Sequence, residues 1–142
     1  MLTGFQMILM CIILTYSSNS NAINNILDQI EIDQVHNDFI ITVSYIKPLL
    51  FRSHSPNNSG DLISIHLAFQ NKLDASILES EALVWKPTDL VPLFEVSLEP
   101  SNSIGADLIF RFSKTVHFEI LNSTDLYSTK IKLHPSTPEL KN

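Results

Sequence analysis

The sequence is poor in several residue types whose abundance marks particular protein classes. Glycine occurs only 3 times in 142 residues, which excludes collagen-like and glycine-rich linker chains. Charged residues make up 17% of the chain and hydrophobic residues 44%, so an acidic disordered tail is excluded as well. The formal net charge is -6, and Arg52 and Arg111 are the only arginines. The chain therefore lacks the basic surface on which nucleic-acid binding depends.

The longest hydrophobic run lies near the N-terminus. Met7 to Leu14 is unbroken apolar sequence, which is shorter than the ~20 residues of a membrane-spanning helix and close to the length of an export-signal core. Polar residues follow, and the small residues Ser20 and Ala22 stand at positions -3 and -1 of a cleavage site. We therefore predict a signal peptide over residues 1–22. No lysine or arginine precedes the run, so an uncleaved membrane anchor is the alternative.

Cleavage after Ala22 would leave a domain without cysteine, because Cys11 is the only one in the chain. Such a domain can form no disulfide framework, thiolate metal site or cysteine nucleophile. The 120 residues that remain (142 minus 22) are enough for one domain with its own core. We expect this domain to cover residues 23–134, with a mobile polar tail at 135–142. The expected location is the periplasm, with membrane contact only through the export signal.

Alternation of apolar and polar residues predicts strands through most of the remaining chain. In Phe39–Tyr45, for example, Phe39, Ile41, Val43 and Tyr45 fall on one face, and Thr42 and Ser44 fall on the other. The seven predicted strands are Ile30–Val35, Phe39–Tyr45, Leu62–Phe69, Leu93–Leu98, Asp107–Phe112, Val116–Leu121 and Tyr127–Leu133. Short strands at this spacing with little helix predict an all-β fold, a β-sandwich of about seven mostly antiparallel strands.

Turn-forming residues predict the connections between these strands. Ser53–Gly60 contains proline, a pair of asparagines and a Ser-Gly step, and is the clearest predicted loop. Ser113–Thr115 has the length of a hairpin turn, so the last three strands are expected to form an antiparallel meander. The segment Asn71–Leu83 is expected to be a short helix or an irregular crossover.

The residue types that carry catalysis form no recognisable motif. None of the five histidines has the i, i+4 spacing of a helical metal site. Ser53, His54 and Ser55 are consecutive, but consecutive side chains of an extended segment point apart, and no G-x-S-x-G motif occurs. His66 and His117 fall on polar strand faces and are expected to be solvated. We therefore predict no catalytic residue, no metal and no cofactor.

The two arginines are candidates for ligand binding. Arg52 and Arg111 lie in or near predicted strands, and a guanidinium can hold a carboxylate ligand through two parallel hydrogen bonds. Pairing with a surface aspartate of the chain itself is the competing interpretation for each arginine, and the one that we favour.

The order of motifs resembles that of a known family. Ile41–Leu67 contains the run SHSP, followed by GD at the start of a strand. This stretch resembles the opening of AMIN-like N-terminal domains, which occur in exported envelope proteins of gammaproteobacteria, often ahead of tetratricopeptide or SPOR regions. The resemblance covers about Ile30–Leu133 and includes the later segments Val91–Val96, Leu108–Ser113 and Val116–Ile120.

The resemblance implies a β-sandwich that binds or localises rather than catalyses, since AMIN domains are associated with peptidoglycan attachment and with the placement of envelope machinery. We therefore expect a non-catalytic module that contacts peptidoglycan or an envelope protein. Two alternatives stay open: a protein-interaction subunit that docks a partner along a sheet edge, and a small secreted hydrolase that uses His54 or the acidic residues. The expected binding residues are Arg52, Ser53, His54, Asp61 and Arg111.

Overall fold

The structure is a computed structural model that describes residues 26–76, 78–85, 94–101, 104–121 and 125–135. The predicted signal peptide at 1–22 lies outside these residues, and so does the predicted tail except for Pro135. The fold is all-β and antiparallel, as predicted, with eight strands in place of seven. The elements are β1 (Leu27–Val35), β2 (Asp38–Tyr45), β3 (Leu49–Ser55), β4 (Ser59–Phe69), α1 (Lys72–Ser76), β5 (Glu81–Trp85), β6 (Phe94–Pro100), β7 (Gly105–Leu121) and β8 (Ser128–His134).

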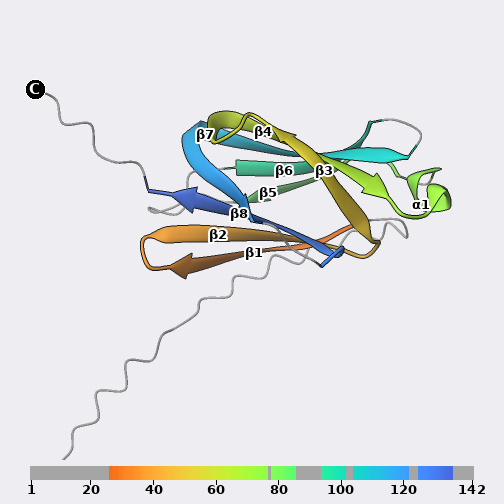
Figure 1. The fold of residues 1–142 in the computed structure, drawn as a ribbon, viewed down its shortest axis with the longest axis horizontal. Helices are drawn as coiled ribbons and strands as arrows, with labels where there is room; N and C mark the ends of the chain where they lie inside the picture. The colour runs from red at the N-terminus through yellow and green to blue at the C-terminus, as the bar shows by residue number, and fades with distance from the viewer. Residues whose placement is uncertain (1–25, 77, 86–93, 102–103, 122–124, 136–142) are drawn as a thin grey trace, which may run out of the picture.

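The strands pair into one open antiparallel sheet that folds over into two layers. Figure 1 shows β4, β5 and β6 in the upper layer and β1, β2 and β8 in the lower layer, with β3 crossing in front. The order along the sheet is β1-β2-β8-β7-β4-β3, and β6 pairs with both β5 and β7. The predicted β-sandwich is therefore confirmed.

Strand β7 joins the two layers, because it runs without a break from Gly105 to Leu121. Its first half pairs with β6, its second half pairs with β8, and β4 pairs with residues of both halves. The predicted antiparallel pairing of the last two segments is therefore confirmed. The predicted hairpin at Ser113–Thr115 is wrong, since this exposed triplet continues β7 where the strand passes from one layer to the other. The triplet lacks the glycine or asparagine of a tight turn, and its β-branched threonine favours an extended backbone.

The two layers bury the apolar faces of the strands in a single core. Every second residue from Ile63 to Phe69 in β4 is buried, as the alternation predicts. The rings of Phe94, Phe110 and Phe112 pack together, with centroids between 5.3 and 6.5 Å apart. Burying one such side chain contributes about 1.5–3 kcal/mol, so a register slip that exposed these faces would be costly. The most deeply buried side chains are Ile26, Ile41, Val43, Ile63, Ile65, Phe94, Val96, Leu98, Leu108, Phe110 and Ile131.

Two local details differ from the sequence-based expectation. Strand β3 extends to Ser55 and β4 begins at Ser59, so the predicted loop at Ser53–Gly60 is too long. Polar residues remain extended here because β3 lies at the edge of the sheet and exposes most of its side chains. The segment Asn71–Leu83 divides into α1, five residues long, and the start of the unpredicted strand β5. Within the described part of the chain no helix has the length and apolar character needed to span a bilayer.

Candidate functional site

A polar row crosses the outer face of the upper layer. Residues that lie directly opposite each other on neighbouring antiparallel strands have side chains on the same face. The register places Glu99 of β6 opposite Asp107 of β7, Asp107 opposite His66 of β4, and His66 opposite Ser53 of β3. Four polar side chains from four strands therefore share one row, and the candidate site lies along it.

The strongest polar contact in this row joins His66 to Asp107. Nδ1 of His66 lies 2.6 Å from Oδ1 of Asp107, and the carboxylate can only accept, so the imidazole nitrogen donates. The side chains of His66 and Asp107 are 48% and 25% exposed, which places the pair at the surface. The contact fixes the orientation of the imidazole and leaves Nε2 as the ring nitrogen that a ligand can use.

A surface cavity of about 440 Å³, half open to solvent, lies beside this pair. This volume is in the range of small-ligand sites in proteins, about 300–1,000 Å³. The cavity forms where Ala68 near the end of β4 pairs with Gly105 at the start of β7, since these small residues leave space above the sheet. The lining combines charged, polar and apolar residues, among them Arg52, His66, Asp107, Ser101, Ala68 and Ile104.

Arg52 reaches this cavity because it stands at an irregularity of β3. The register with β4 shifts between Phe51 and Ser53, which leaves Arg52 as the extra residue of a bulge. A bulge changes the direction of a side chain relative to the regular strand. Arg52 is exposed, lines the cavity and forms no ion pair with any described residue. Its guanidinium is therefore available to an anionic ligand.

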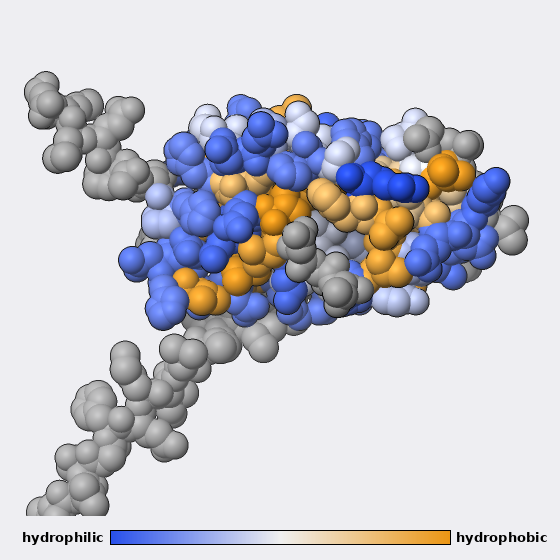
Figure 2. Space-filling view, viewed as in Figure 1, coloured by the Kyte–Doolittle hydropathy of each residue, from blue (hydrophilic) through white to orange (hydrophobic). Residues whose placement is uncertain are grey.

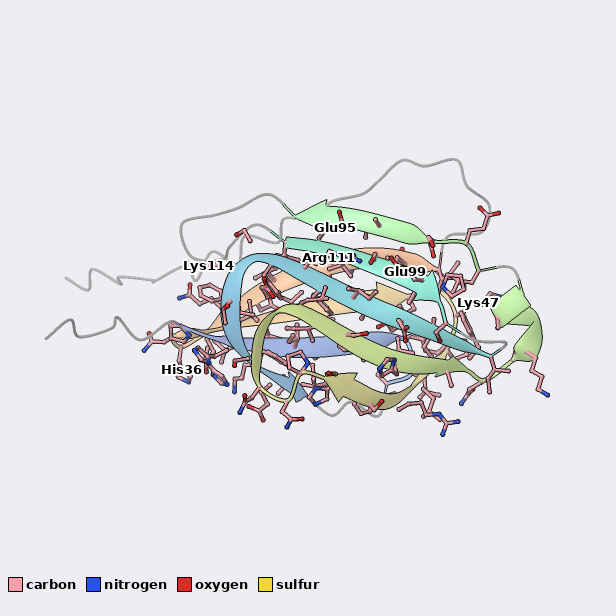
Figure 3. The ribbon with its side chains drawn as sticks, turned by 90° about the horizontal axis from the view of Figure 1, so that it is seen from above. His36, Lys47, Glu95, Glu99, Arg111 and Lys114 are labelled. Carbon is pink, nitrogen blue, oxygen red and sulfur yellow. The ribbon has the colours of Figure 1, made fainter. Side chains whose placement is uncertain are left out.

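Arg111, the other arginine predicted to bind a ligand, has partners within the protein. Nη1 lies 3.1 Å from Oγ of Ser97 and 3.5 Å from Oε1 of Glu95, and Nη2 lies 3.8 Å from Oε1 of Glu99. Figure 3 shows Arg111 of β7 near Glu95 and Glu99, which both lie on β6. Arg111 is not among the described residues that line the cavity. The structure thus pairs this arginine with surface carboxylates of its own chain, but they are glutamates and not the predicted aspartate.

The other predicted binding residues divide between the two sides of the sheet. His54 is opposite the buried Ile65, and its Nδ1 donates to the carbonyl oxygen of Pro56 at 2.9 Å. Its ring also contacts Phe118, with centroids 6.0 Å apart, so His54 stabilises the β3–β4 turn and does not reach the cavity. Asp61 is exposed at a second irregularity, in β4. Among the predicted residues only Arg52 lines the cavity, and Ser53 lies in the adjoining row.

The row Ser53, His66 and Asp107 has the residue types of a nucleophile, a base and an orienting acid. Acyl transfer also requires donors aimed at the oxyanion that forms in the transition state. Backbone N–H groups of a sheet point within its plane toward neighbouring strands, so donors to a group bound on its face would have to be side chains such as Arg52. These polar side chains can hold a ligand by hydrogen bonding. No group of three or more potential metal ligands occurs among the described residues.

The described groups with clearly shifted pKa values lie away from the cavity. Burial raises the pKa of Tyr45, whose hydroxyl donates to Oγ1 of Thr129 at 2.6 Å inside the core. Burial also raises the pKa of Glu81, against the opposing effect of backbone N–H groups, and its carboxylate accepts from the N–H of Ile26 at 2.8 and 2.9 Å. This contact ties β5 to the beginning of β1, so both groups are structural.

Sequence reasoning missed the two residues that contact each other most closely in the site. His66 was expected to be solvated, and Asp107 was not distinguished from the other acidic residues of the sequence. The available signal was that both residues lie on polar faces of predicted strands. They are 41 positions apart in the sequence, so only the register of β4 against β7 shows that they are neighbours.

Comparison with known proteins does not identify this chain, since no family model, curated protein or solved structure matches it. The resemblance to AMIN-like domains therefore stays a prediction from sequence motifs. What the protein does must be inferred from the geometry of the site.

Proposed function

We propose that this protein is a non-catalytic binding module exported to the bacterial cell envelope, and that the cavity between Arg52, His66 and Asp107 holds its ligand. The observation that carries the proposal is the free guanidinium of Arg52 beside a hydrogen-bonded His–Asp pair on the rim of a cavity of about 440 Å³. Rigid strands supply all three side chains, which suits a site that binds one chemical group in a fixed orientation.

Peptidoglycan is the proposed ligand material. Its short peptides and sugar chains present carboxylates, amides and hydroxyl groups, which are the partners that arginine, histidine and aspartate side chains recognise by hydrogen bonding. The signal-like N-terminus and the resemblance to AMIN-like domains support an envelope location. An envelope protein that offers the same groups is the other partner compatible with this site.

Cosedimentation with purified peptidoglycan sacculi tests the wall-binding proposal. The protein is expected to pellet with sacculi, and Arg52→Gln is expected to remain mostly in the supernatant. Lys114→Gln is the matched control, because Lys114 is also an exposed cation but lies at the bend of β7, where Figure 3 labels it. Failure of the native protein to pellet, or equal retention of Arg52→Gln, would rule out wall binding through this cavity.

Export is tested separately by following the full chain in cells. Fractionation of a gammaproteobacterial host is expected to place the protein in the periplasm, and mass spectrometry of the purified product is expected to show a chain that begins at Ile23. A product that keeps its first 22 residues and sediments with membranes would support the uncleaved anchor instead.

A second candidate function is docking of a protein along the edge strand β3. Among the described strands β3 pairs only with β4, and it exposes Leu50 and Phe51, which are 40% and 41% accessible. Figure 2 shows apolar surface gathered between polar margins on the side where β3 crosses the molecule in Figure 1. An exposed edge can accept another strand through backbone hydrogen bonds.

Photocrosslinking distinguishes this candidate from wall binding. A photoreactive amino acid in place of Phe51 is expected to trap an envelope protein in living cells if β3 docks a partner. The same substitution at Val35, which is 42% exposed and lies at the end of β1, is the control position. Absence of any protein adduct at position 51 would count against edge docking.

A further inference from the structure

The cavity combines one unpaired cation with a small apolar floor. Arg52 supplies a guanidinium that no described side chain neutralises, in a chain whose formal net charge is -6. Ala68 lies at the base, and Ile104, 37% exposed, lies at the side. Leu50 is opposite Ala68 in the register and extends the apolar surface toward β3. A ligand that fills this space needs an anionic group next to a small apolar group.

The remaining charges of the cavity limit which anions fit. Asp107 lies on the rim, so a ligand with two or more negative charges would be repelled from the side opposite Arg52. A carboxylate carries one charge and matches the planar fork of an arginine with two hydrogen bonds. The carboxylate of Asp107 can in turn accept a hydrogen bond from an N–H group of the ligand.

The described lining residues also argue against a sugar ring as the group that enters the cavity. They include no phenylalanine, tyrosine or tryptophan on which the face of a sugar could pack.

We propose that the cavity binds the free carboxylate end of a peptide whose last residue is small and apolar. Arg52 holds the carboxylate, the terminal side chain rests against Ala68 and Ile104, and Asp107 accepts from a peptide N–H. This inference rests on the proposed function, because it names the part of the wall material that the cavity would recognise: the peptide end and not the sugar chain.

Peptide binding measured by fluorescence anisotropy tests this inference with the folded native protein. The probe is a fluorescein-labelled Gly-Ala-Ala peptide with a free carboxylate, in versions ending in L- or D-alanine, compared with the same peptides as C-terminal amides. At least one free acid is expected to bind at least tenfold more tightly than its amide. That preference is expected to fall below about twofold in Arg52→Gln and to persist in Lys114→Gln.

Amide shifts in two-dimensional NMR spectra make the test independent of how well the variants fold. On adding the free acid, the resonances of Arg52, His66 and Asp107 are expected to shift. Equal binding of acid and amide, no binding of either, or shifts that avoid these residues would overturn the inference. If the protein still pellets with sacculi in that case, the proposed function stands without the carboxylate site. If the protein does not pellet with sacculi either, the proposed function and this inference are both overturned.

Discussion

Nδ1 of His66 lies 2.6 Å from Oδ1 of Asp107, and this hydrogen bond ties β4 to β7 at the rim of the cavity. A hydrogen bond to an ionised carboxylate is shorter and stronger than one between neutral groups. The pair therefore holds the imidazole in one orientation beside Arg52, which a binding site needs if it is to select one geometry of ligand.

His66→Ala is expected to weaken retention on sacculi. The loss of one hydrogen-bonding group costs about 0.5–1.5 kcal/mol, which corresponds to roughly a 2- to 10-fold lower affinity. His117→Ala is the matched control, because His117 is also an exposed strand histidine but lies on the second half of β7. Cosedimentation at several protein concentrations gives the affinities, and an equal loss in both variants would remove His66 from the site.

Tyr45→Phe is expected to destabilise the fold by about 1–2 kcal/mol. The substitution removes the hydroxyl that donates to Oγ1 of Thr129 at 2.6 Å and leaves the buried threonine without this partner. Tyr127→Phe is the control, since Tyr127 is 51% exposed. Urea unfolding monitored by circular dichroism measures both free energies of unfolding, and a Tyr45→Phe variant as stable as the native protein would contradict the structure.

The same tyrosine affects stability in alkali. Burial raises the pKa of Tyr45 above its ordinary value of about 10, so the folded state holds the phenolic proton more tightly than the unfolded state does. The stability that this contributes is present below pH 10 and is lost as the pH rises through the raised pKa. Above pH 10 the native protein is therefore expected to lose stability more steeply than Tyr45→Phe.

Glu81→Gln is expected to change how stability depends on pH in mild acid. Burial raises the pKa of Glu81, so the folded state favours the protonated carboxyl. The stability contributed by this shift is complete below the ordinary glutamate pKa of about 4.3 and is lost as the pH rises through the raised value. The Tm of Glu81→Gln minus that of the native protein is therefore expected to be more positive at pH 7 than at pH 4.

Differential scanning calorimetry at pH 4, 5.5 and 7 measures this difference. Glu79→Gln is the control, because Glu79 is exposed. A difference that is independent of pH, or one that grows toward pH 4, would show that Glu81 is not held in the half-buried contact with Ile26.

His36→Gly is expected to stabilise the protein. His36 has φ = 57°, a left-handed conformation that costs a non-glycine residue about 1–2 kcal/mol and costs glycine little. Since glycine also loses more entropy on folding, the net gain is roughly 0.5–1 kcal/mol. His36 and Asn37 connect β1 to β2, and φ of Asn37 is not positive. Asn37→Gly is therefore expected to bring no gain in urea unfolding, and equal gains at both positions would contradict this backbone geometry.

Several strands of the fold were predictable from the sequence, because they carry a local period of two. The buried faces of β2, β4 and β6 follow directly from alternating residues such as Ile63 and Ile65 or Val96 and Leu98. The bend in β7 was not predictable in this way. Its polar triplet has the length of a hairpin turn, and only the pairing of the flanking halves with β6 and β8 shows that the strand continues.

The candidate site was predictable only in part, since its geometry depends on contacts between distant strands. Arg52 was identified from residue chemistry alone, but its position at the cavity depends on a bulge that no local pattern indicates. The prediction for Arg111 could not anticipate Glu95 and Glu99, which reach it across the β6–β7 pairing. Residue type thus indicated what could bind, and strand register determines which residues remain free to do so.

The most direct test of the central claim, that the cavity is the binding site, is an NMR titration of the isotope-labelled protein with soluble peptidoglycan fragments. The account predicts that the backbone resonances of Arg52, His66, Gly105 and Asp107 shift progressively and saturate, while those of Lys132 and His134 on the other layer stay in place. No change at saturating fragment concentration, or changes confined to β1, β2 and β8, would contradict it.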